Sequence, residues 1–258
     1  MAKKGLEVLG IDIGTDEIKG CIIDTEHGKF SSDIKTTKLK STSTHKVISA
    51  IHKLVSKEFK WDGPIGCTIP EAVTKGVSLS SRRLDSSWET TDAQHLISEI
   101  TGSEVSVLND ADACGIAELK FGAGRDQSGV IIVLTVGKGI GSAIFADGKL
   151  FPNTELGMME IRGITAQQRA SNKARKEEGL GRKAWAKRIE FVLEAYEQMF
   201  HPDLFILGGQ ISKKAEKTLP HIKINTPIVG ASFENEASLV GAAVYAADRF
   251  QGQKVFYM

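Results

Sequence analysis

The chain has few cysteines, no long apolar run and almost no net charge, and each of these shortages excludes a class of protein. Its three cysteines, Cys21, Cys67 and Cys114, lie far apart, without a Cys-x-x-Cys pair or a histidine at metal-ligand spacing. This pattern argues against a disulfide framework and against a structural zinc site. We therefore expect buried thiols in a reducing compartment, either the cytoplasm or the stroma or matrix of an organelle.

The hydropathy and the charge balance limit the partners. The longest apolar run, 130–134, is too short to span a bilayer, and the amino-terminal residues contain no apolar signal region. Lys and Arg number 33 against 32 Asp and Glu, so no overall field draws the protein to nucleic acid or to a membrane. We expect neither as a partner, and any basic binding site must be local.

The chain is long and apolar enough for one or two sizeable cores. It has 258 residues, of which 41% are hydrophobic, and this excludes disorder or a coiled coil as a description of the whole chain. No low-complexity linker divides it, so two closely coupled lobes are favoured over two independent domains.

Two stretches repeat one pattern of strand, small-residue turn and strand. The first covers 6–23 and turns at Asp12-Ile13-Gly14-Thr15, and the second covers 130–146 and turns at Gly137-Lys138-Gly139-Ile140-Gly141. Such a duplication predicts two similar lobes that face a cleft, with backbone N–H groups aimed into the cleft from both sides.

Hydrophobic periodicity and capping residues predict the remaining elements. Helices are expected over 44–59, with Thr44 as N-cap, and over 92–100, 110–121, 165–178, 182–200, 212–219 and 236–250. Further strands are expected over 30–37, 65–69, 76–79, 105–108 and 204–207.

Three glycine-containing turns are candidate phosphate sites. The turn at Asp12 can form a nest of N–H groups for phosphate while the carboxylate orients metal-bound water, although a plain β-turn explains it about as well. The loop at 137–141 would supply the opposing half of a phosphate clamp. Gly208 and Gly209 end an apolar strand, where the backbone can approach a ligand or simply needs positive φ for a turn.

The pair Asn109-Asp110 follows an apolar strand and begins a predicted helix. Asp110 is therefore either the helix N-cap or a general base that takes the proton of a sugar hydroxyl during attack on a phosphoryl group. The segment 153–157 and Glu160 offer further oxygen acceptors for a polyol, and a polar surface loop would look similar.

Several motifs in this order resemble those of the polyphosphate glucokinases, members of the ROK branch of the actin-like, hexokinase-type sugar kinases. The similarity runs over 8–247. The most specific stretches are Val-Leu-Asn-Asp-Ala-Asp-Ala at 107–113 with Glu118, Phe-Gly-Ala-Gly-Arg at 121–125, Gly-Ile-Gly-Ser-Ala at 139–143, Pro-Asn-Thr-Glu-Leu-Gly at 152–157, and Pro-Asp-Leu-Phe-Ile-Leu-Gly-Gly at 202–209 with Ser-Lys-Lys at 212–214.

The resemblance implies an α/β protein with the actin-like sugar kinase fold, two lobes of β-sheet flanked by helices around a central cleft. One lobe would comprise 1–108 plus 236–258 and the other 109–235. The implied activity is transfer of a phosphoryl group from polyphosphate or ATP, with Mg²⁺, to the 6-hydroxyl of glucose or a related hexose. A homodimer is expected.

The resemblance also assigns roles to individual residues. Asp110 would be the catalytic base, Asn109, Glu155 and Glu160 would bind the sugar, and Asp12 would assist Mg²⁺. The residues expected to bind phosphate or Mg²⁺ are Asp12, Gly14, Thr15, Lys19, Gly137, Gly139, Gly141, Gly208 and Gly209. A basic tract is expected either to guide a long polyanion or to be an ordinary solvated helix face; it comprises Arg162, Arg169, Lys173, Arg175, Lys176, Arg182, Lys183, Lys187 and Arg188.

The chain departs from the family pattern around the expected site. The substituted positions are Asp16 and Glu17 in the first phosphate loop, Lys138 in the second, and Glu71, Arg83 and Met158 among the sugar contacts. Methionine cannot replace the hydrogen bonds of the usual histidine. These changes are expected either of an altered specificity or of a degenerate relative that serves as a binding or structural subunit of a larger hetero-assembly.

Overall fold

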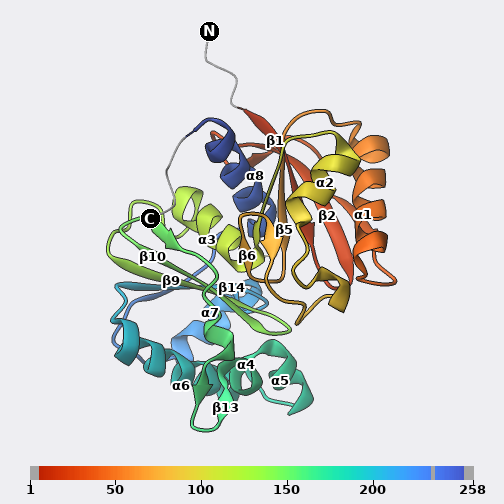
Figure 1. The fold of residues 1–258 in the computed structure, drawn as a ribbon. Helices are drawn as coiled ribbons and strands as arrows, with labels where there is room; N and C mark the ends of the chain where they lie inside the picture. Colours follow the sequence, from red (N-terminus) through yellow and green to blue (C-terminus); the bar gives the residue numbers. More distant parts are fainter. Residues whose placement is uncertain (1–5, 234–235, 253–258) are drawn as a thin grey trace. The chain divides into compact units, whose positions relative to one another are not determined.

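The computed structural model describes residues 6–233 and 236–252, which form two units (Figure 1). The first unit comprises the described residues up to Ala117 together with those from Glu236 onward, and the second comprises the described residues from Glu118 to Phe233. The boundary expected from the sequence lies slightly earlier in the chain, between residues 108 and 109. Parts of the predicted lobes, namely 1–5, 234–235 and 253–258, lie outside the described residues. None of the helices described is long and apolar enough to cross a membrane.

The first unit is built on a six-stranded mixed sheet. Its strands are β1 (Glu7–Ile13), β2 (Glu17–Asp24), β3 (Lys29–Phe30), β4 (Lys35–Lys38), β5 (Ile65–Ile69) and β8 (Val105–Asn109), in the order β3-β2-β1-β5-β8 with β4 also on β2. β1 and β2 form an antiparallel hairpin, whereas β1, β5 and β8 run parallel. A small hairpin of β6 (Val73–Thr74) and β7 (Val77–Ser78) follows β5.

The helices of the first unit cover this sheet. They are α1 (Thr44–Lys53), which continues as a π-helical turn η1 (Leu54–Phe59), the short η2 (Ser86–Trp88), α2 (Ala93–Thr101), the start of α3 (Asp110–Phe121) and α8 (Ala237–Phe250). Alternate residues of the strands face opposite sides. Leu9, Ile11 and Ile13 join the core with α1 and α2. Gly10 and Gly66 lie on the other face, where an added Cβ would collide with the backbone of α8. These glycines therefore let α8 approach the sheet closely.

The second unit repeats the strand order of the first. Its sheet consists of β9 (Val130–Val136), β10 (Ile140–Ala146), β11 (Lys149–Phe151), β14 (Leu204–Gly209) and β15 (Ile228–Gly230), in the order β11-β10-β9-β14-β15. β9 and β10 form an antiparallel hairpin, and β14 is parallel to β9 and β15. The two sheets thus share the topology that the repeated hairpins predict.

Short helices and one long helix complete the second unit. They are η3 (Leu156–Met158), α4 (Ala166–Ala170), α5 (Asn172–Glu177), α6 (Arg182–Phe200), η4 (Ser212–Lys214), α7 (Ala215–Thr218) and η5 (Leu219–His221), with a hairpin of β12 (Glu160–Ile161) and β13 (Ile164–Thr165) before α4. Trp185, Ile189 and Tyr196 of α6 pack with the sheet residues Leu134 and Phe205 in one core.

Several predicted elements are interrupted in the structure. The predicted helix over 165–178 is two helices, because Ser171 adopts an extended backbone conformation and its side chain caps α5 by accepting from Ala174 N at 3.1 Å. The predicted strand over 30–37 is split into β3 and β4, and the predicted helix over 212–219 consists of short pieces. The predicted cap Thr44 is also wrong, since Ser43 occupies the N-cap and the Thr44 hydroxyl instead donates to Ser87 O at 3.0 Å.

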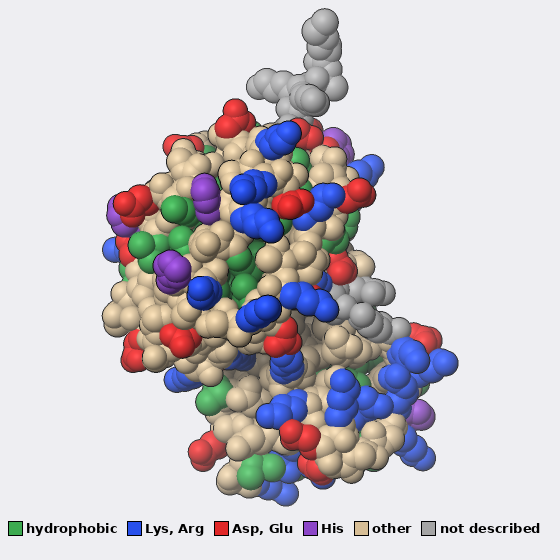
Figure 2. Space-filling view, turned by 90° about the vertical axis from the view of Figure 1, so that its right-hand side faces the viewer, with side chains coloured by type: hydrophobic (Ala, Val, Ile, Leu, Met, Phe, Trp, Pro, Cys, Tyr) green, Lys and Arg blue, Asp and Glu red, His purple; other side chains and the backbone are tan. Residues whose placement is uncertain are grey.

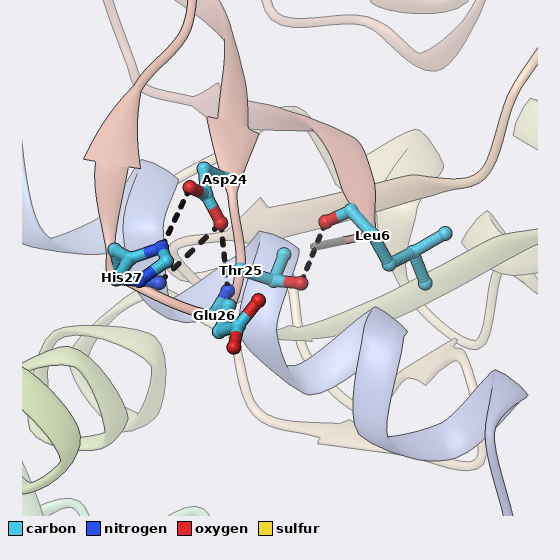
Figure 3. Close-up of polar contacts among 5 residues, drawn as sticks. All are labelled: Leu6, Asp24, Thr25, Glu26 and His27. Atoms are coloured by element: carbon cyan, nitrogen blue, oxygen red, sulfur yellow. Dashed lines mark hydrogen bonds and ion pairs between the residues drawn. The ribbon is translucent and has the colours of Figure 1, made fainter. Parts of the chain in front are cut away.

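The turn that ends β2 is closed by its own side chains (Figure 3). Asp24 Oδ1 accepts from Glu26 N at 3.0 Å, and Asp24 Oδ2 lies 2.9 Å from Nδ1 of His27. The hydroxyl of Thr25 donates to Leu6 O at 2.7 Å, which ties the turn to the start of the sheet. The hydrogen bond with His27 holds the pKa of Asp24 below its usual range.

Candidate active site

The predicted site residues of the first unit follow three parallel strands of one sheet. Asp12 of β1 lies opposite Thr68 of β5, and Ile69 lies opposite Asn109 at the end of β8. Asp12 and the pair Asn109-Asp110 therefore come off the same edge of the sheet. In open α/β sheets, ligands bind outside the carboxyl ends of parallel strands.

Asp12 is held by hydroxyl groups from two neighbouring elements. Thr68 Oγ1 donates to Asp12 Oδ1 at 2.6 Å, and the side chain of Ser238, in the first turn of α8, also hydrogen-bonds to this carboxylate. Burial raises the pKa of Asp12, against the opposing effects of these two hydrogen bonds and of the charge on Lys19. Sequence reasoning missed Thr68 and Ser238, although the predicted strand phase places Thr68 beside Asp12.

Lys19 lies directly across the hairpin from Asp12, because the two residues are paired in register. Its ammonium group lies 3.8 Å from a carboxylate oxygen of Glu17 and 3.9 Å from one of Glu236. Glu17, one of the substituted positions of the first phosphate loop, is thus paired with a cation. The role of Lys19 in phosphate binding stays a prediction.

The two predicted phosphate turns are closed in similar ways. Gly14 N donates to Glu17 O at 2.9 Å in the β1–β2 hairpin, and Gly137 N donates to Gly139 O at 2.9 Å in the β9–β10 hairpin. Gly141 lies within β10, opposite Thr135, and not in the loop. The N–H groups of Gly14 and Gly137 therefore close their own turns.

Substituted side chains occupy the tips of these turns. Thr15 Oγ1 lies 3.4 Å from Asp16 Oδ1, and Asp16 and Lys138 are exposed. The added charges that the sequence identifies are therefore on the surfaces of their respective units.

Gly208 and Gly209 adjoin the second of these turns. They end β14 in register with Thr135 and Val136 of β9. Gly209 has φ of +76°, and an added Cβ would come within 2.9 Å of the Val136 carbonyl oxygen. The requirement for positive φ is confirmed at Gly209. A phosphate contact at either glycine stays a prediction.

Asn109, and not Asp110, provides the main cap of α3. Asn109 Oδ1 accepts from Ala111 N at 2.8 Å and from Asp112 N at 3.1 Å, while its Nδ2 donates to Glu71 O at 3.1 Å. Its side chain is buried, and at most one amide N–H is left to contact a sugar. Asp110 is half-buried at the first position of the helix, where the helix dipole stabilises a negative charge. The cap of α3, which is one of the two roles expected for Asp110, is therefore supplied by Asn109.

Glu71, a substituted position among the expected sugar contacts, has its carboxylate bound by a neighbouring loop. Its side chain is only 2% exposed and accepts four hydrogen bonds, all from residues 80–84. Oε1 accepts from Arg83 N at 2.6 Å and Leu84 N at 2.9 Å, and Oε2 accepts from Ser80 Oγ at 2.7 Å and Arg82 N at 3.1 Å. The carboxylate thus fixes the loop 80–84.

The predicted sugar-contact segment of the second unit is anchored to β10. Ser142 Oγ bonds to Thr154 O and accepts from Leu156 N at 3.0 Å, and Tyr196 Oη donates to Leu156 O at 2.7 Å. Gly157 packs so closely on Ile140 that a Cβ would collide with it. These contacts fix the backbone on both sides of Glu155.

The two predicted sugar carboxylates differ in exposure. Glu155 is half-buried and Glu160 is exposed, and neither carboxylate hydrogen-bonds to any residue that the structure describes. Met158, at the position of the usual histidine, is at the surface, with its sulfur 3.0 Å from Gln167 Nε2. Both carboxylates are available for a sugar, whereas Met158 adds no strong donor or acceptor.

The basic tract is concentrated on α4, α5 and α6, in the lower part of Figure 2. Three of its cations are paired: Lys173 with Glu177 at 3.8 Å, Arg188 with Glu178 at 2.8 Å and Lys187 with Glu190 at 2.7 Å. Three guanidinium groups lie over aromatic rings: Arg162 and Arg169 over Phe191, and Arg175 over Trp185.

Two exposed lysines of this tract differ from the rest. Arg182 donates to Thr218 Oγ1 at 3.4 Å, whereas the ammonium groups of Lys176 and Lys183 have no ion pair or hydrogen bond with a described residue. Much of the tract therefore fastens helices together, and these two lysines are the best candidates for attracting a polyanion.

The residues at Asp12 fit the Mg²⁺ ion that the resemblance implies. Among the described residues, no three His, Cys, Asp or Glu side chains cluster as a metal site. Mg²⁺ is commonly bound through one or two carboxylates together with substrate phosphates and water, so a single carboxylate suffices. The Thr68 hydrogen bond occupies one oxygen of Asp12 and orients the group.

These two units, with their matching sheets and flanking helices, have the architecture of the actin-like sugar kinases. A solved ROK family glucokinase from Streptomyces griseus, in complex with glucose and AMPPNP, has the same fold, with a TM-score of 0.81 at 20% identity over 93% of this chain and 99% of that chain. The sequence pattern of the ROK family matches residues 8–161. The chain belongs to the ROK family.

Two relatives with higher sequence identity are sugar kinases whose names refer to polyphosphate. A polyphosphate glucokinase of Mycobacterium leprae (strain TN) is 44% identical over 91% of this chain and 73% of the relative. A solved inorganic polyphosphate/ATP-glucomannokinase from Arthrobacter sp. strain KM is 38% identical, with a TM-score of 0.90 over 95% of this chain and 100% of that chain. The resemblance to the polyphosphate glucokinases that the motifs indicate is confirmed.

Proposed function

We propose that this protein is a sugar kinase that transfers a phosphoryl group from polyphosphate or ATP to the 6-hydroxyl of glucose. The similarity to polyphosphate glucokinases supports this activity. The observation that carries the proposal is the start of α3, where Asn109 caps the helix and Asp110 occupies the first helical position. A carboxylate at the carboxyl end of a parallel strand, with the capping task filled by its neighbour, suits a general base.

In this mechanism, Asp110 accepts the proton of the sugar 6-hydroxyl as the hydroxyl oxygen bonds to the terminal phosphorus of the donor. The bond between that phosphorus and the donor's bridging oxygen breaks, and the shortened donor leaves with the electron pair. Glu155, Glu160 and the remaining N–H of Asn109 bind the sugar hydroxyls. Fixed donors and acceptors of this kind orient a polyol, which places its reacting oxygen near the base.

The proposed donor site comprises Asp12 and the predicted phosphate glycines. Asp12 would hold Mg²⁺, and Thr68 and Ser238 keep its carboxylate oriented. When bound, Mg²⁺ neutralises charge that develops on the transferred phosphoryl group. Lys19 supplies a further positive charge next to Asp12.

The second candidate function is a catalytically degenerate subunit of a larger assembly. The substitutions Asp16, Lys138 and Met158 favour it, because they replace residues of the usual phosphate and sugar shells. For the active form we propose an intracellular homodimer.

The deciding experiment measures glucose 6-phosphate formation by the purified protein with polyphosphate and, separately, with ATP. Parallel reactions without the protein serve as the background control. Turnover with either donor at least about tenfold above that background supports the kinase. Turnover equal to the background with both donors contradicts it and favours the degenerate subunit, and mass photometry of the same samples reports the assembly state.

A further inference from the structure

One buried residue of the first unit contacts two segments near the proposed site, the start of α3 through its backbone carbonyl and the loop 80–84 through its side chain. The strand β5 ends at Ile69, next to the end of β8 at Asn109, and Glu71 follows two residues after β5. The backbone carbonyl of Glu71 accepts the hydrogen bond from Asn109 Nδ2, and its side chain reaches the loop 80–84. Glu71 therefore contacts both the cap of α3 and a loop that is distant in the sequence.

The carboxylate of Glu71 is held mainly by backbone N–H groups. Arg82, Arg83 and Leu84 present three consecutive N–H groups to its two oxygens, and Ser80 adds a hydroxyl. Consecutive N–H groups of this kind form an anion-binding nest, and here the anion is a side chain of the same protein. The loop conformation is therefore tied to the presence of an acceptor at position 71.

The same chain of hydrogen bonds reaches the proposed base. The loop 80–84 bonds to the Glu71 carboxylate, the Glu71 carbonyl bonds to Asn109, and Asn109 caps the helix that begins with Asp110. A shift of Glu71 would move the loop and the helix start together. The guanidinium of Arg83, whose backbone is fixed in this way, makes no hydrogen bond or ion pair with a described residue.

We propose that Glu71 is a positioning residue for the sugar acceptor, which it serves by fixing the loop 80–84 relative to Asn109 and Asp110. This inference rests on the proposed sugar kinase function and names a residue of that same site. Asp12, on which the donor side of the site depends, is held by Thr68 and Ser238, which take no part in the hydrogen bonds of Glu71. Changes at Glu71 should therefore affect the KM for glucose and the KM for polyphosphate differently.

The test compares Glu71→Ala and Glu71→Gln with the unmodified protein. Alanine leaves the N–H groups of Arg83 and Leu84 without their acceptor, so we expect the KM for glucose to rise by at least about tenfold and kcat to fall. Glutamine keeps an oxygen for these two groups, so we expect a rise in the KM for glucose of no more than about threefold. The KM for polyphosphate should change by less than about twofold in both variants.

A matched control comes from a second buried carboxylate. Glu118 is also almost fully buried, and it accepts hydrogen bonds from Ala123 N, Ser232 N and Phe233 N within the second unit. Glu118→Gln and the Glu71 variants should all lower the urea midpoint, but Glu118→Gln should leave the KM for glucose unchanged. This comparison separates a general loss of stability from a loss of positioning.

Several results would overturn the inference. It fails if the Glu71→Gln variant, which keeps the two main hydrogen bonds, raises the KM for glucose as much as Glu71→Ala does. It fails equally if the constants for glucose and polyphosphate change together, or if Glu118→Gln reproduces the effect. Should Glu71→Ala fail to fold, Ser80→Ala takes its place: it removes one hydrogen bond to the carboxylate, and an unchanged KM for glucose contradicts the proposal.

Calorimetry with glucose keeps this inference distinct from the proposed function. If the unmodified protein binds glucose without transferring phosphate, the proposed function fails. The role of Glu71 is then tested by the Kd for glucose, which should rise by at least about tenfold in Glu71→Ala and by no more than about threefold in Glu71→Gln. If the unmodified protein does not bind glucose at all, the positioning role is also refuted.

Discussion

Replacement of Asp110 by asparagine tests the proposed base with little disturbance of the fold. The change removes one negative charge and keeps the shape of the side chain. Asp110 Oδ1 accepts from Ala111 N at 2.8 Å, and an asparagine oxygen can accept the same bond. The helix cap itself stays with Asn109. The loss of favourable charge at the helix start amounts to about 0.3–1 kcal/mol, so we expect the unfolding free energy to fall by less than about 1 kcal/mol.

The effect of this variant on the rate should be much larger. General-base catalysis contributes about 10²- to 10⁴-fold, and the lower bound corresponds to about 2.7 kcal/mol of barrier height. We therefore expect kcat for glucose phosphorylation to fall by at least about 100-fold, while the Kd for glucose changes by less than about threefold.

The assay pairs steady-state kinetics with urea denaturation of the same preparation. Asp92→Asn is the control, because Asp92 caps α2 by accepting from His95 N at 2.8 Å and lies at a helix start with no proposed role. Asparagine is an equally good cap, so this control should keep both rate and stability. A purified Asp110→Asn variant with kcat within about tenfold of the unmodified protein would refute Asp110 as the base.

Three further changes test other features. Because burial raises the pKa of Asp12, its carboxylate lowers stability above the folded-state pKa, and this penalty disappears as the pH falls through that value. Asp12→Asn should therefore raise the urea midpoint at about pH 8, with a gain that shrinks towards about pH 4, and should abolish turnover; a lower midpoint at pH 8 contradicts this. Joint replacement of Lys176 and Lys183 by glutamate should raise the KM for polyphosphate several-fold at low salt without affecting the KM for ATP, whereas equal effects on both donors would exclude a polyanion-specific role. Gly66→Ala should lower the unfolding free energy by at least about 2 kcal/mol, because its methyl group meets the α8 backbone. The control Gly181→Ala, which has open space around the added methyl group, should lower it by less than about 1 kcal/mol. Similar losses in the two variants would contradict the close approach of α8 to the sheet.

The strand pattern of both sheets could be predicted from the sequence because it depends on local signals. Alternation of apolar residues and the glycine turns identified both hairpins, and the repetition of one pattern anticipated the matching strand orders. The break at Ser171 was not anticipated, because both flanking segments are good helix formers and the serine cap is a local choice that periodicity does not reveal.

The candidate site shows a different limit. The sequence identified Asp12, Asn109 and Asp110, since each follows an apolar strand. It could not show that Asn109 supplies the cap, and it suggested that Glu71 alters the sugar contacts. The four donors to Glu71 lie 9 to 13 positions further along the chain, and only the folded loop brings them to its carboxylate.

The return of α8 to the first sheet also has a consequence for protein synthesis. The sheet is complete in sequence at the end of β8, Asn109, but the helix that closes one of its faces starts only at Ala237. At about 5–20 residues per second, the ribosome needs roughly 6–25 s to supply the intervening chain. Throughout this interval the sheet face that carries Gly10 and Gly66, which α8 covers in the folded protein, is open. The second unit can fold during the same interval, as an insertion within a first unit that only the last helix completes.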